Sequence, residues 1–99
     1  MRSVARWVVV MQFGYGNQYR VEEVTRFEST PEQARATLYE IACTHRPRPS
    51  LRQQHREVFR VGDGDAYYVH IAGMMSTYRV LYRLAELAWS TGAAPAYPQ

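Results

Sequence analysis

The chain has 99 residues, a length that fits one domain rather than two. Hydrophobic residues make up 46% and charged residues 21%, as in an ordinary globular domain, and the net charge of +3 mildly favours an acidic partner. The single cysteine, Cys43, excludes an intramolecular disulfide and a cysteine-based zinc site. No segment reaches transmembrane length and no secretory signal is present, so we expect a cytoplasmic protein without membrane contact.

All twelve basic residues are arginine. Arginine makes bidentate contacts with phosphate groups, which would suit nucleic-acid recognition. Codon bias in a GC-rich bacterial genome explains the same composition, and the alanine content agrees with it. Only the placement of the arginines therefore carries information.

A nine-residue sequence occurs twice, as FGYGNQYRV at residues 13–21 and as VGDGDAYYV at residues 61–69. Both copies keep two glycines, a tyrosine and the final valine. Each copy lies between apolar runs, and each is followed by a helical pattern. The sequence therefore predicts one supersecondary unit made twice.

The first unit begins with an alternating apolar segment over residues 4–13, which predicts a strand. Gly and Asn at residues 14–17 predict a turn, because both residue types accept positive φ. Residues 19–27 then form the returning strand. Phe13 opposite Tyr19 would keep the aromatic pair on the buried face, and this contact sets the expected register.

A helix is predicted to start at Thr30, with Pro31 at its first position and Gln33 completing a capping box. Its apolar face combines five residues at helical spacing: Ala34, Leu38, Ile41, Ala42 and His45. Pro47 and Pro49 end it. Residues 46–54 then read as an extended basic linker.

The second unit is expected to repeat this pattern. Phe59 and Val61 would face inward with Tyr67, Val69 and Ile71, and the turn would lie at residues 62–65. After Gly73, a second helix is expected from about Met75 to Ser90. Its apolar face would contain Val80, Leu81, Leu84, Leu87 and Ala88, with Gly92 as the stop.

The predicted fold is α+β, with a duplicated β-β-α unit in the order ββαββα. Its four-stranded antiparallel sheet would carry two helices on one face. We expect a single domain over residues 1–92, with units at about 4–46 and 55–92 and a flexible tail at 93–99.

The predicted register leaves one face of the sheet without a helix. An antiparallel sheet with one wet face should carry polar residues there, but this face mixes valines with charged side chains. We therefore expect a small non-enzymatic interaction protein (an adaptor, an accessory subunit or an immunity-type protein) that forms a homodimer or binds another protein. The expected partner-binding residues are Val8, Val10, Arg20, Glu22, Val24, Val58, Arg60, Tyr68 and His70.

Nucleic-acid binding is the alternative function, because the linker region is rich in arginine and tyrosines on a sheet can stack bases. The residues expected to carry it are Arg46, Arg48, Arg52 and Arg56. No RNA-binding aromatic motif accompanies them, and a solvated charged linker explains the same residues.

A third hypothesis is a small enzyme that uses His70 with Glu22 or Tyr68. No cofactor and no metal ion are expected, because the three histidines have no known ligand spacing. The acidic turn at residues 62–65 lacks the further ligands of a calcium loop. Cys43 reads as a packed thiol rather than as a nucleophile.

Overall fold

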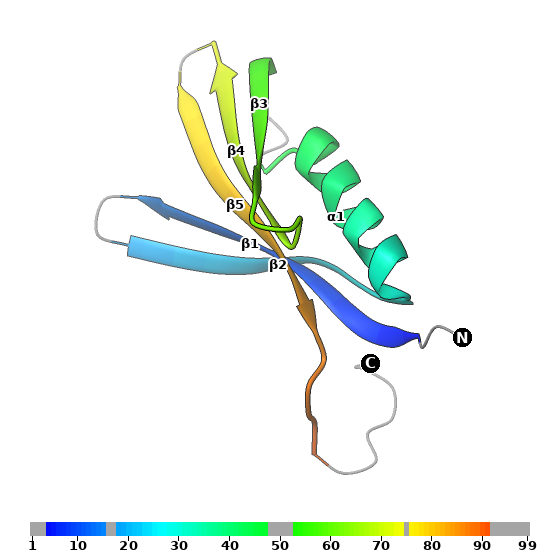
Figure 1. The fold of residues 1–99 in the computed structure, drawn as a ribbon. Coiled ribbons are helices and arrows are strands. Elements are labelled where there is room, and N and C mark those ends of the chain that lie inside the picture. Colours follow the sequence, from blue (N-terminus) through cyan, green and yellow to red (C-terminus); the bar gives the residue numbers. More distant parts are fainter. Residues whose placement is uncertain (1–3, 16–17, 48–52, 75, 92–99) are drawn as a thin grey trace.

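The computed structural model describes residues 4–15, 18–47, 53–74 and 76–91. One helix and five strands follow one another along the chain in the order β-β-α-β-β-β (Figure 1). They are β1 (Ala5–Tyr15), β2 (Gln18–Ser29), α1 (Pro31–Thr44), β3 (Gln53–Val61), β4 (Ala66–Gly73) and β5 (Thr77–Glu86).

The five strands form one antiparallel sheet in the order β2-β1-β5-β4-β3. β5 therefore lies in the centre, while β2 and β3 are the two edges. Figure 1 shows a strongly twisted sheet with α1 on one side of it. No other helix or strand of the described residues covers the opposite side, which we call the open face.

Helix α1 begins and ends close to where the local sequence predicts. Thr30 is the N-cap, and its hydroxyl accepts a hydrogen bond from the Gln33 backbone N–H at 3.3 Å. Pro31 occupies the first turn, where a backbone N–H has no acceptor within the helix, so proline costs no hydrogen bond there. The buried side of α1 consists of Ala34, Leu38 and Ala42, as the helical spacing predicts.

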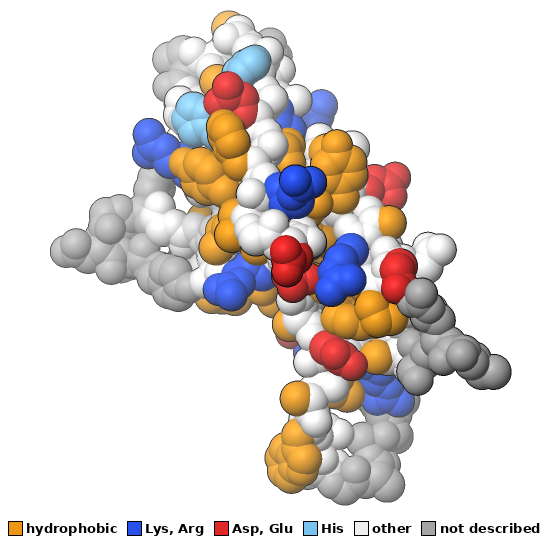
Figure 2. Space-filling model, viewed as in Figure 1, with side chains coloured by type: hydrophobic (Ala, Val, Ile, Leu, Met, Phe, Trp, Pro, Cys, Tyr) orange, Lys and Arg blue, Asp and Glu red, His pale blue; other side chains and the backbone are white. Residues whose placement is uncertain are grey.

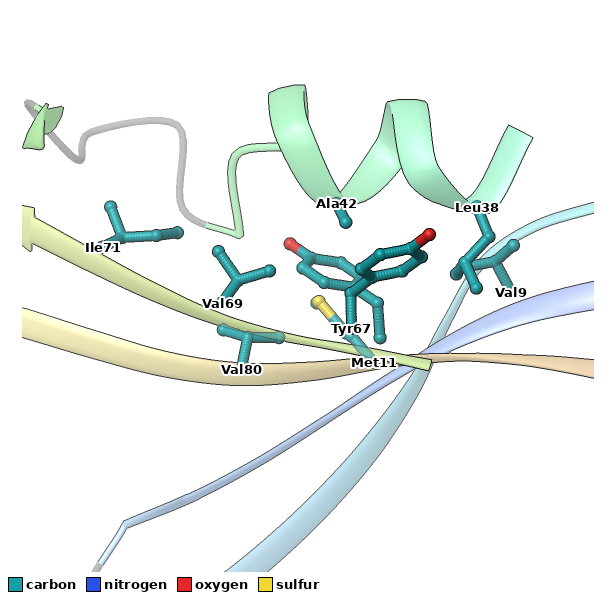
Figure 3. Packing of buried hydrophobic residues seen from close by; sticks show 9 residues of the cluster. Val9, Met11, Leu38, Ala42, Tyr67, Val69, Ile71 and Val80 are labelled. Atoms are coloured by element: carbon teal, nitrogen blue, oxygen red, sulfur yellow. The ribbon is translucent and has the colours of Figure 1, made fainter. Parts of the chain in front are cut away.

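The core lies between α1 and the sheet. Leu38 and Ala42 point from the helix towards buried residues of β1, β4 and β5, including Val9, Tyr67 and Val80 (Figure 3). These five residues are almost entirely buried. Close packing of apolar side chains against one face of the sheet fixes which residues are left on the other face.

The predicted second helix is wrong, because residues 77–86 form the central strand β5. Tyr78, Val80 and Tyr82 alternate along its helix-facing side, while Leu81 points to the other side. A central strand carries apolar residues on both faces, so its sequence also fits helical spacing. Hydrogen bonding of both edges of β5, to β1 on one side and to β4 on the other, favours the strand over the helix. The ββαββα fold and its four-stranded sheet are therefore replaced by one helix over five strands.

The two copies of the nine-residue sequence are not structurally equivalent. In the first copy, β1 continues through Gly14 to Tyr15, and Phe13 pairs with Arg20. In the second copy, β3 ends at Val61, which pairs with Ala66 across a turn. Gly62 and Gly64 in that turn have φ values of 61° and 100°, which favour glycine. The two hairpins therefore differ in the length of their connections.

The register of the first hairpin also differs from the predicted one. Val9 pairs with Thr25 and Val10 pairs with Glu23, so Val24 is an extra residue at a β-bulge. Val24 packs against the core instead of facing outward. The bulge separates two phases of the strand: Thr25 and Phe27 after it keep their predicted inward face, whereas the residues before it are reversed, and Val21 consequently points away from the core and is exposed.

Some predicted features lie outside the described residues. They are residues 48–52 of the expected linker, residues 16–17 of the first turn, and the expected tail at 93–99. The other end of the expected linker is part of the sheet, because β3 begins at Gln53.

Candidate functional site

The open face carries a continuous cross-strand row of largely apolar side chains. Phe59 pairs with Tyr68, Tyr68 with Leu81, Leu81 with Gln12, and Gln12 with Val21. Directly paired residues of an antiparallel sheet project on the same side. These five residues, which we call the central row, therefore cross the whole sheet from one edge strand to the other.

The two ends of the central row are well exposed. Val21 is 53% exposed on β2 and Phe59 is 49% exposed on β3, next to Val61 at 46%. The rings of Phe59 and Tyr68 are stacked, with centroids 5.9 Å apart and planes 29° apart. The stacked rings and the exposed valines thus form an apolar surface at the two ends of the central row.

A charged cluster borders the central row at the β3 edge. The Glu57 carboxylate lies 3.7 Å from His55 Nε2 and 3.7 Å from His70 Nδ1. Arg79 follows His70 across the sheet on β5. Figure 2 shows histidine and acidic side chains together at the top of the molecule, with hydrophobic side chains exposed directly below them. This cluster forms a polar rim beside the apolar row.

The structure separates the nine predicted partner-binding residues into two groups. Val8, Val10, Tyr68 and His70 project on the open face, as the sequence predicts. The others project on the helix side or pack against the core: Arg20, Glu22, Val24, Val58 and Arg60. The prediction for β3 is wrong by one residue, because Val58 pairs with the buried Val69.

Sequence reasoning missed most of the open face, and its apolar residues in particular. The missed residues include Val21, Glu57, Phe59, Val61 and Leu81. The expected second unit places Phe59 and Val61 inside, but the two copies of the repeat are not structurally equivalent. The alternation of Glu57 with Val58 fits either face, so the local sequence of β3 carried no signal that would have found these residues.

Arg56 belongs to a polar cluster beneath the C-terminus of α1. Its guanidinium donates to the carbonyl oxygen of Ala42 at 2.7 Å, to that of His45, and to Gln53 Oε1 at 2.7 Å. Carbonyl groups at a helix C-terminus lack intrahelical donors and attract a positive charge. These hydrogen bonds of Arg56 therefore hold β3 against the C-terminal end of α1.

His45 and Tyr82 complete this cluster. His45 Nδ1 and the Tyr82 hydroxyl are 2.8 Å apart, and the two rings meet edge to face. Burial raises the pKa of Tyr82 to about 12. Burial, reinforced by the charge of Arg56, lowers the pKa of His45. Both groups are therefore held neutral inside the fold at neutral pH.

The residues proposed for nucleic-acid binding are not gathered into one described surface. Arg46 is exposed, Arg56 is engaged with the helix end, and Arg48 and Arg52 lie outside the described residues. The open face carries acidic Glu57 and Glu23 beside its aromatic side chains. These positions give the alternative function no specific support.

Of the two partners expected for His70, Tyr68 lies on the same face of β4 and Glu22 does not. Glu57 contacts His70, whereas Glu22 lies on the helix side of the sheet. A general base normally works in a cleft that positions the substrate. Glu57 and His55 are both exposed at a sheet edge, which favours a role at the rim of an interface.

A groove of about 620 Å³ lies at the end of the sheet where β1 begins and β5 ends. Trp7, Phe27 and Leu87 line it together with the Arg6–Glu28 pair, whose charged groups are 3.5 Å apart. Val8 and Arg26 contribute to both the groove and the open face, so the groove extends that face.

Within the part of the chain that the structure describes, no group of histidine, cysteine and acidic residues is arranged to hold a metal ion. In the acidic turn, Asp65 instead pairs with Arg35 of α1 at 3.0 Å. Among the described residues, no helix is both long and apolar enough to cross a membrane.

No family model, curated protein or solved structure matches this chain. The chain is therefore classified by its own fold and site. It is a small α+β protein with one helix over a five-stranded antiparallel sheet and a partly apolar open face.

Proposed function

We propose that this protein is a small non-enzymatic interaction module that docks on another protein surface through its open face. The observation that carries the proposal is the central row, in which apolar side chains from both edge strands and the central strand lie in one line. Adaptors, accessory subunits and immunity-type proteins act in this way.

The chemistry of the open face supports a protein partner. Interfaces combine an apolar centre with a polar rim, and they are enriched in aromatic residues and arginine. Here Phe59 and Tyr68 provide aromatic area, while Arg79 and the Glu57 cluster provide a rim. A nucleic acid would instead require an excess of positive charge along the face.

One pair of opposite charges near the apolar row is compensated inside the chain. Arg26 makes two hydrogen bonds of 2.8 Å with the Glu23 carboxylate. Pairing with Arg26 also lowers the pKa of Glu23. Docking an apolar surface over such pairs costs less than burying isolated charges.

The first test places a carboxylate at either end of the central row. Val21→Asp and Phe59→Asp should each weaken a complex more than tenfold, because an unpaired charge at an apolar contact costs about 2 kcal/mol. The wild type should form a complex of defined stoichiometry, either with itself or with a protein from its own host. Mass determined by light scattering and quantitative co-purification would measure it.

Val4→Asp is the matched control, because Val4 is 62% exposed before β1 and lies outside the central row. Circular dichroism and thermal unfolding must show that all three variants fold. The proposal fails if the wild type is monomeric and recovers the same proteins as Val21→Asp and Phe59→Asp. Salt-sensitive binding to single-stranded nucleic acid in place of protein would also contradict it.

A further inference from the structure

We infer that the open face binds a single amphipathic helix of another protein, and that acidic residues border the apolar stripe of this helix on both sides. The inference rests on the proposed docking function and specifies the chemistry of the partner. Three properties of the face carry it: its dimensions, the central row, and two arginines of β5 that pair with no acidic residue of the described chain.

The dimensions of the face suit one helix. β5 has both of its neighbours, β1 and β4, beside it only at Leu81, Tyr82 and Arg83. Beyond these levels the β1–β2 hairpin and the β3–β4 hairpin diverge (Figure 1). The part of the face that all five strands share is therefore roughly 24 Å across the strands and 10 Å along them. A helix of about 16 residues has this length and this width, whereas a globular partner needs about 800 Å².

The central row provides the apolar contact for such a helix. Phe59, Tyr68 and Leu81 form one continuous apolar half of it, and Val21 forms its other end. A helix can lie on these side chains because its backbone groups bond to one another. An extended segment would instead bring unpaired N–H and C=O groups onto an apolar surface. Helix α1 already covers the opposite face of the sheet in this way.

Two arginines of β5 lie on either side of the central row. Arg79 and Arg83 project on the open face, two residues before and two residues after Leu81. Within the described residues, no hydrogen bond or ion pair engages the Arg79 guanidinium. The guanidinium of Arg83 donates one long hydrogen bond, of 3.5 Å, to Gln12 Oε1. Both positive charges are therefore available to a partner.

The acidic residues at the levels of these arginines lie two strands away. Glu57, His70 and Arg79 follow one another across the sheet, and Glu23 stands in the same relation to Arg83. Two strand spacings separate the backbones by about 10 Å. The Glu23 carboxylate also accepts two hydrogen bonds from another arginine. Covering the two free guanidinium groups is therefore costly unless the partner supplies carboxylates.

The positions of the two arginines specify where these carboxylates lie on the helix. Arg79 and Arg83 are about 14 Å apart along β5, with the central row between them. A helix over the row has a radius of about 5–6 Å with its side chains, so one flank would reach Arg79 and the other Arg83. The helix therefore needs acidic residues on both borders of its apolar stripe.

Two labelled synthetic peptides test the inference. Each has about 16 residues and the same leucine stripe at helical spacing, bordered by glutamates in one peptide and by lysines in the other. In fluorescence anisotropy at low salt, the wild type should bind the glutamate peptide about tenfold more tightly than the lysine peptide. Combining Arg79→Glu with Arg83→Glu should reverse this preference, because the same positions then carry negative charge.

The matched control combines Arg20→Glu with Arg60→Glu. Both of these arginines are exposed on the helix side of the sheet, so the net charge changes equally while the open face is unaltered. This variant should keep the preference for the glutamate peptide. Phe59→Asp should weaken binding of that peptide, because it removes part of the apolar contact. Circular dichroism must show that every variant folds.

Equal binding of the two peptides by the wild type, or no binding of the glutamate peptide at millimolar concentration, would overturn the inference. A reversal in the Arg20 and Arg60 control would also overturn it, and so would tighter binding of a single-stranded oligonucleotide than of the glutamate peptide. Failure of the proposed function is distinguishable. A protein complex that Val21→Asp disrupts, but that the Arg79 and Arg83 double variant leaves intact, keeps the docking face and excludes the acidic helix.

Discussion

At the scale of single residues, Arg56 shows that a side chain can have a structural role that differs from the role its neighbours in sequence suggest. In the sequence it belongs to a run of arginines and indicates nucleic-acid binding. In the structure its donors are occupied by carbonyl groups of Ala42 and His45. Predicting this role would require knowing that β3 returns beneath the end of α1, which no local pattern reveals.

The polar cluster around His45 predicts how stability depends on pH. The pKa of His45 is lowered in the folded state by burial and by Arg56, whereas the unfolded chain has the ordinary value near 6.5. The unfolded state therefore binds the proton more readily. The free energy of unfolding should be fully retained above about pH 6.5 and should fall as the pH decreases through the folded-state pKa.

The measurement is urea unfolding at several values between pH 7.5 and pH 5. His45→Gln removes the titrating ring, so the variant should show a shallower loss of stability over this range. His55→Gln is the control, because His55 is exposed at the sheet edge. An equal slope in the wild type and the His45→Gln variant would contradict this role of His45.

At the scale of elements, the sequence predicts α1 well and the sheet poorly. The cap at Thr30, Pro31 and the helical spacing of Leu38 and Ala42 all act within a few residues of one another, so they can be read locally. Strand pairing depends on residues far apart in sequence. The Val24 bulge and the insertion of β5 between β1 and β4 are both decided by such distant contacts.

The sheet order predicts which backbone amides are best protected from hydrogen exchange. Val80 and Tyr82 lie in β5, whose two edges are both paired, so their amides should be among the slowest to exchange. Alternate amides of the edge strand β3 have no partner strand and should exchange orders of magnitude faster. Exchange followed by NMR would measure both; fast exchange throughout residues 77–86 would contradict the central position of β5.

At the scale of the whole molecule, one side of the sheet builds the core and the other remains available. An uncovered, partly apolar sheet face was predictable from alternation along β1, which places Val8 and Val10 opposite the core. The composition of its β3 half was not predictable, because the supposed repeat placed Phe59 inside. The corrected face is more aromatic than the predicted one, and its sides differ in bulk.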